Sequence, residues 1–170
     1  RTVHPRRSAR ASELTPDRPQ RLSAIRAGIR EAHRYGVTSV QNAHGQPDDI
    51  DLWGELSRGQ ELKLRMYHSL SVGPGFSEAD ADAFEATRRK YPDDPLLKAG
   101  AIKIMVDGVI ESHTAAMLAP YTNRPTKGMP NFTREDLNRI VTMLDKRGWQ
   151  IWIHAIGDGG IRMALDAFEA

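Results

Sequence analysis

The sequence predicts an α/β fold, in which four parallel strands alternate with helices as in half of a (β/α)8 barrel. The first observation is a pattern that occurs four times: an amphipathic helical stretch ends, a Gly follows and an apolar strand begins. Such alternation is typical of βαβ units and a parallel sheet. The second observation is the length of 170 residues, because a whole barrel needs roughly 200 residues or more. A doubly wound sheet fits the same pattern.

The composition indicates a globular protein without cysteine chemistry. Charged residues make up 27% of the chain, and there is no cysteine. Disulfides and thiolate metal sites are therefore excluded, and any metal must be held by His, carboxylate or a modified lysine. No apolar run approaches the roughly 20 residues of a membrane helix, and no secretory signal is visible. We expect a cytoplasmic protein without a membrane partner.

The N-terminal residues differ in charge from the rest of the chain. Residues 1–30 contain eight arginines and two acidic residues. Such an arm could contact nucleic acid or anionic membrane, or resemble a transit segment. No aromatic residue or motif accompanies the charge, so we expect a solvated, disordered arm over 1–14 and no nucleic-acid partner. The barrel domain is then 15–170. Because the chain does not begin with Met, we expect a processed protein or a fragment.

The first two helix–strand units lie in the N-terminal half. A stripe with helical period is formed by Leu22, Ile25, Ile29 and Ala32. Gly36 ends this helix, and 37–40 is predicted to be a strand. A short helix over 52–58 then ends at Gly59, before a strand over 62–70. Gly suits such junctions because it adopts the left-handed conformation without a Cβ penalty.

The other two units follow the same pattern. Ser77 is predicted to cap a helix that runs to about Lys90, and Gly100 precedes a strand over 101–106. Thr133 and Asp136 resemble a capping box before the next helix.

The chain then leads into its last strand and helix. Gly148 precedes the strand over 149–154, and Asp158 is predicted to be the N-cap of the last helix, over 159–170.

Lys103 is a charged residue in an otherwise apolar strand. Ile102, Ile104 and Val106 share one face of that strand, so Lys103 points to the other. A buried ammonium must be paired, deprotonated or modified. It could bind a substrate anion, form a Schiff base, or be carboxylated by CO2 into an anionic metal ligand. Alternatively, its amine reaches solvent or meets Asp107.

His154 stands at the carboxyl end of the last predicted strand, where parallel α/β folds place their sites. It could be a metal ligand or general base, or simply a hydrogen-bonded histidine. Asp158 could orient it, or only cap the following helix.

Asp107 ends the Lys103 strand and could bind substrate or a metal, or stabilise a turn before Gly108. It is followed by a long loop over 109–128, in which His113 could contact substrate. A surface role for His113 is the alternative.

These segments resemble metal-dependent amidohydrolases, most closely the YtcJ-type, N-substituted formamide deformylase-like branch. The resemblance rests on AIKIMVDG over 101–108, SHTAAML over 112–118 with Pro120-Tyr121, and HAIGD over 154–158. It covers roughly residues 20–170. It implies strands two to five of a (β/α)8 barrel, with carboxylated Lys103 on strand four and His154 on strand five as ligands of a divalent metal. The metal is expected to be Zn2+ and the substrate a small amide-like molecule.

The chain also departs from the family pattern. It has no His-x-His, and the family's strand-six His and strand-eight Asp are not matched. We therefore expect the 170 residues alone to be inactive. Two alternatives remain: a Schiff-base lyase that uses Lys103, and a non-catalytic truncated paralogue or interaction fragment.

Overall fold

The computed structural model describes residues 16–92 and 94–170 and contains one parallel sheet of four strands. The strands are β1 (Ser39–Gln41), β2 (Arg65–Val72), β3 (Leu97–Met105) and β4 (Gln150–His154), and they lie in the order β1-β2-β3-β4. Every neighbouring pair is parallel. The predicted basic arm over 1–14 lies outside the described residues.

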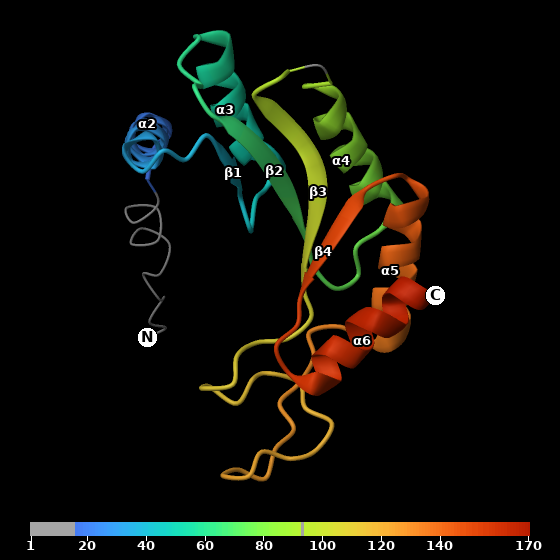
Figure 1. Ribbon diagram of the computed structural model, residues 1–170. Helices are drawn as coiled ribbons and strands as arrows, with labels where there is room; N and C mark the ends of the chain where they lie inside the picture. The colour runs from blue at the N-terminus through green and yellow to red at the C-terminus, as the bar shows by residue number, and fades with distance from the viewer. Residues whose placement is uncertain (1–15, 93) are drawn as a thin grey trace, which may run out of the picture.

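Helices pack against the curled sheet (Figure 1). α3 (Pro47–Arg58), α4 (Glu78–Arg89) and α5 (Arg134–Lys146) connect consecutive strands, whereas α2 (Arg18–Arg34) precedes β1 and α6 (Asp158–Glu169) follows β4. This arrangement confirms the predicted partial (β/α)8 barrel. No helix of the described residues is long and apolar enough to span a membrane.

The core lies between the sheet and its helices, in two clusters. The larger cluster joins β2 and β3 to α4, α5 and α6, and the smaller one joins the amino ends of β2 and β3 to α2 and α3. Ile102, Ile104 and Val106 are fully buried in the larger cluster. Because side chains alternate along a strand, Lys103 and Met105 point to the opposite, concave face.

Two of the four junction glycines differ from the prediction. Gly36 and Gly148 do adopt the left-handed conformation, with φ of +72° and +69°. Gly59 has a φ of −77° and needs no such freedom. Gly100 lies inside β3, where a Cβ would come within 2.2 Å of the Tyr67 hydroxyl. Its absent side chain therefore makes room for a neighbouring ring and does not end a helix.

The strand β3 starts earlier than predicted, at Leu97. The Asp94 carboxylate accepts the N–H groups of Leu96 and Leu97, at 2.8 and 3.1 Å, and so fixes the entry to the strand.

The helix caps were predicted in part. Ser77 caps α4 as expected. Thr133 caps α5, but the Asp136 carboxylate accepts the N–H of Gly75 instead of closing a capping box. The N-cap of α6 is Gly157, so the prediction of Asp158 was wrong. The Asp158 carboxylate accepts the N–H of Leu118 at 2.7 Å, because the long loop packs against this helix start.

Candidate functional site

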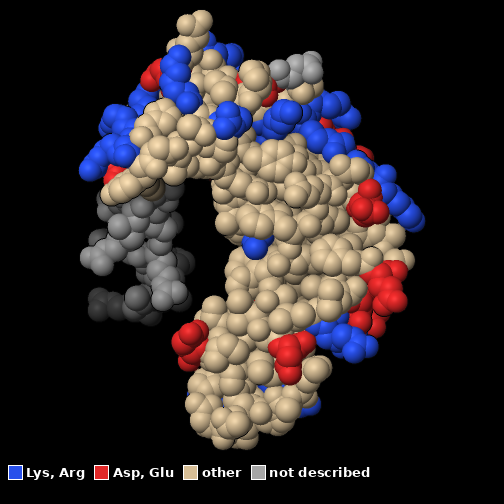
Figure 2. Space-filling view, viewed as in Figure 1, with Lys and Arg blue, Asp and Glu red and all other residues tan. Residues whose placement is uncertain are grey.

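The candidate site lies on the concave face of β3 and β4, toward their carboxyl ends. In the register of these strands, Lys103 pairs with Trp152 and Met105 with His154. Paired residues of parallel strands project to the same side. The two predicted ligands therefore share one face, which is turned away from the helix-packed core. Figure 2 shows that this side of the molecule is hollowed and has few charged side chains.

The Lys103 amine lies in an aromatic and partly desolvated setting. Its Nζ stands 4.5 Å from the centroid of the Trp152 ring, a distance typical of a cation–π contact. Among the described residues it has no carboxylate partner, so the predicted alternative of a contact with Asp107 is not present. Burial lowers the pKa of the Lys103 ammonium, which increases the share of neutral amine at a given pH.

The His154 ring is oriented by a backbone carbonyl. Its Nε2 lies 3.1 Å from the oxygen of Gly108. A carbonyl oxygen only accepts, so Nε2 carries the hydrogen and donates it. In the neutral ring, Nδ1 then keeps its electron pair and can act as an acceptor or metal ligand. Metal-binding histidines typically donate their other N–H to such a partner.

Asp107 lies two residues beyond the carboxyl end of β3 and is only 1% exposed. Its carboxylate accepts the backbone N–H groups of Ala116, Ile156 and Gly157. The 109–128 loop and the β4–α6 connection fold over Asp107 and supply these backbone partners. Its contact with substrate stays a prediction.

His113 helps to shape the long loop. Its ring lies edge-on to that of Tyr121, with 4.8 Å between centroids, and its Nε2 is 3.0 Å from Asn123 Oδ1. It adopts a left-handed conformation, with a φ of +59°, which is uncommon for a residue other than Gly. Its contact with substrate stays a prediction.

A second pair of polar residues borders Lys103. His44 Nδ1 lies 2.9 Å from Ser71 Oγ, and Ser71 pairs with Lys103 in the register of β2 and β3. His44, Ser71, Lys103 and Phe132 line a pocket of about 270 Å³. In the sequence, His44 is marked only weakly, by its position just beyond the first predicted strand, and no sequence signal points to Ser71.

The residues fit part of a metal site. Lys103, once carboxylated, would supply an oxygen ligand and His154 Nδ1 a nitrogen ligand, and both suit a borderline cation such as Zn2+. Within residues 16–92 and 94–170 there is no cluster of three or more His, Asp or Glu that could hold a metal. Further metal ligands would have to come from residues outside these two ranges.

Comparison with curated proteins gives relatives that are much longer than this chain. YtcJ of Bacillus subtilis (strain 168), which is named as an amidohydrolase, is 25% identical over 155 residues, which are 86% of this chain and 27% of YtcJ. The exoenzymes regulatory protein AepA of Pectobacterium carotovorum subsp. carotovorum is 32% identical over 145 residues, covering 84% of this chain and 30% of AepA. This chain therefore spans less than a third of either relative.

A solved structure supports the fold. A metal-dependent hydrolase from Pyrococcus furiosus, of uncharacterised activity, superimposes with a TM-score of 0.73 at 22% identity, over 93% of this chain and 33% of its own. The model of the amidohydrolase family matches residues 3–170. The resemblance was expected to begin at about residue 20. The family match instead begins at residue 3 and so includes most of the predicted basic arm. This chain therefore belongs to the amidohydrolase family.

Proposed function

We propose that this chain is part of a metal-dependent amidohydrolase that hydrolyses C–N bonds of small amide-like molecules. Within the family we place it in the YtcJ-type, N-substituted formamide deformylase-like branch. The observation that carries the proposal is the placement of Lys103 and His154 on one face of adjacent strands, toward their carboxyl ends. In barrel enzymes this end holds the reacting groups.

Lys103 is suited to carboxylation. Addition of CO2 requires a neutral amine, and burial lowers the pKa of this ammonium. The product would be an anionic carbamate, an oxygen ligand for a divalent metal, for which we propose Zn2+. A bound metal of this kind supplies Lewis acidity and lowers the pKa of a coordinated water.

The other residues of the site would keep the two ligands in place. The Trp152 ring covers the Lys103 amine at 4.5 Å and limits its contact with water. The Gly108 carbonyl fixes the proton of His154 on Nε2 and leaves Nδ1 for the metal. Trp152 lies on the neighbouring strand β4, and Gly108 lies in the segment that directly follows β3. Since both contacts come from the chain itself, the ligands are oriented before any metal binds.

Metal content tests this proposal in the longest natural polypeptide that contains the chain. We expect Lys103→Gln and His154→Gln each to reduce retained zinc by at least about tenfold after dialysis, measured by elemental analysis. Lys98→Gln is the matched control, because Lys98 is exposed on the same strand. 13C NMR with labelled bicarbonate should show a carbamate signal that is lost in Lys103→Gln. Unchanged zinc in both site variants would refute the ligand assignment.

A further inference from the structure

The Asp107 carboxylate connects three segments of the chain beneath the candidate site. Oδ2 accepts the N–H of Ala116 at 2.9 Å and that of Gly157 at 2.8 Å, and Oδ1 accepts the N–H of Ile156 at 2.9 Å. A buried carboxylate is costly unless such donors surround it. Three backbone donors hold this one in a single orientation.

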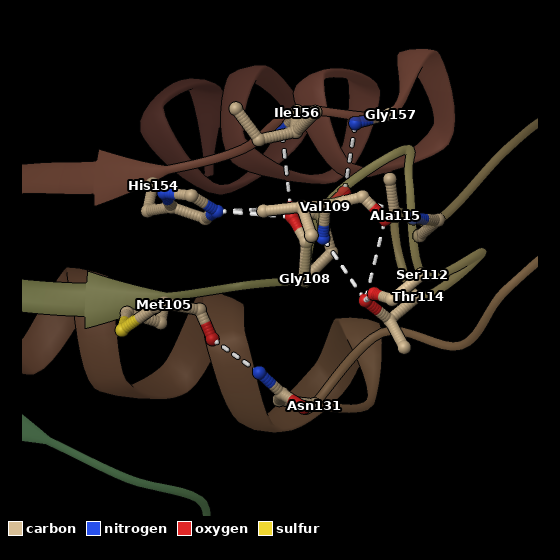
Figure 3. Close-up of polar contacts among 12 residues, drawn as sticks. Met105, Gly108, Val109, Ser112, Thr114, Ala115, Asn131, His154, Ile156 and Gly157 are labelled. Carbon is tan, nitrogen blue, oxygen red and sulfur yellow. Dashed lines mark hydrogen bonds and ion pairs between the residues drawn. The ribbon is translucent and has the colours of Figure 1, made fainter.

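Two of these donors follow closely after His154 in the chain. Ile156 and Gly157 come two and three residues after it, and Figure 3 shows them near the His154 ring. By accepting their N–H groups, Asp107 fixes the backbone that carries this ring. The next residue after Asp107 acts on the ring itself, since the Gly108 oxygen lies 3.1 Å from Nε2. Asp107 and Gly108 thus determine both the position and the orientation of the imidazole.

The Asp107 charge also acts on the ring. Its Oδ1 lies 3.9 Å from His154 Nε2. A negative charge at this distance favours a proton on Nε2 over an electron pair there. The carboxylate and the Gly108 carbonyl therefore favour the same tautomer.

The packing around the Asp107 carboxylate leaves little room for this group to adopt another position. A Cβ on Gly160 would lie 2.5 Å from Asp107 Oδ2, and a Cβ on Gly108 would lie 2.0 Å from Thr114 Oγ1. Both glycines allow close approach, and one side of the Asp107 carboxylate is closed by the first turn of α6.

We propose that Asp107 is a positioning residue, which holds His154 in the tautomer with hydrogen on Nε2 and leaves the Nδ1 electron pair free. Its importance for catalysis rests on the proposed function, in which His154 is a ligand. The tautomer itself follows from the contacts of this chain and can be measured without metal or substrate.

The experiment is 15N NMR of the intact, metal-stripped protein labelled at histidine, with His154 assigned through His154→Gln. In the wild type we expect the shifts of one tautomer, with Nε2 protonated and Nδ1 not. Asp107→Asn has nearly the same size but lacks the charge and has one acceptor oxygen for three N–H groups. We expect the two His154 shifts to move toward each other as the tautomers begin to exchange.

Asp158→Asn is the matched control. The Asp158 carboxylate also connects the long loop to the start of α6, through Leu118, but among the described residues it makes no hydrogen bond to Ile156, Gly157 or the His154 ring. We expect the His154 shifts of this variant to equal those of the wild type. An equal change in both variants would mean that Asp107 acts only through general stability of the loop.

Gly160→Ala provides a second test, should Asp107→Asn fail to fold. Alanine favours the helix, yet its Cβ displaces the Asp107 carboxylate. We expect the His154 shifts to move in the same direction as in Asp107→Asn. Unchanged shifts in both variants, or a wild-type ring protonated on Nδ1, would overturn the inference. A wild type with the expected tautomer that retains no zinc would refute the proposed function alone.

Discussion

His68 shows how burial changes the chemistry of a single residue. It lies on β2 with no solvent exposure. Its Nε2 bonds to the Gln46 carbonyl at 3.1 Å, and its Nδ1 has no partner among the described residues. Burial lowers the pKa of the ring, and this effect outweighs the hydrogen bond to Gln46 and the charge of Asp49, which both raise it. The folded protein therefore favours neutral His68.

Stability should depend on pH through this residue. The unfolded state takes up a proton near the ordinary histidine pKa of about 6.5, whereas folded His68 takes it up only at lower pH. The unfolded state thus binds more protons in this range, and the free energy of unfolding falls as the pH drops below about 6.5. The decrease in unfolding free energy that is due to His68 ends once the pH is below the pKa of this ring in the folded state.

Urea unfolding at a series of pH values checks this prediction. We expect His68→Gln to lose less stability than the wild type between pH 7 and 5, measured as the change in unfolding free energy, because the titrating ring is gone. His33→Gln is the control, since His33 is exposed on α2, and it should follow the wild type. Equal slopes for His68→Gln and wild type would contradict the assignment.

The helix–strand junctions have different local causes although their sequences look alike. Gly148 joins α5 to β4 with a φ of +69°, and no atom would meet a Cβ there. Only the backbone conformation therefore calls for glycine at this position. Gly28, in the middle of α2, has open space and no positive φ.

These two glycines give opposite predictions. Gly148→Ala should lower the free energy of unfolding by about 1–2 kcal/mol, because an L-residue is strained in the left-handed region. Gly28→Ala should raise it by up to about 1 kcal/mol through helix propensity. Denaturant titration of both variants separates the effect of backbone conformation from the effect of replacing a glycine as such. A stabilised Gly148→Ala would show that this junction tolerates a side chain.

At the scale of the whole molecule, the sheet and its last helix have surfaces without a partner in the described part of the chain. β1 and β4 each pair with one neighbour only. On α6 the apolar residues Ile161, Leu165 and Phe168 are 45%, 60% and 54% exposed. In a complete barrel further strands and helices would cover such surfaces.

We predict that the 170 residues alone do not hydrolyse amides. The proposal assigns them two ligands, Lys103 and His154, and the described residues contain no larger donor cluster. The assay would follow amine release from N-formyl and N-acyl amines with added zinc and bicarbonate, with the longest natural polypeptide as the positive control. Metal-dependent turnover by the 170 residues, lost in His154→Gln, would disprove this prediction.

The sequence by itself determined the order and type of the elements. Helical stripes and short apolar runs are local patterns, so the four strands and the face of Lys103 followed from spacing alone. The position of His154 at a strand end followed in the same way. The family was identified from short motifs around these two residues, and the match to the amidohydrolase family confirmed it.

Only the tertiary structure decided which partners each polar residue meets. Asp107 bonds to Ile156 and Gly157, about 50 residues away in the chain, and Gly100 makes room for the Tyr67 ring on the neighbouring strand. The burial of His68 likewise depends on the segments that pack around β2. Periodicity reports on neighbours within one element, whereas these contacts arise where separate elements meet, and no local pattern contains that information.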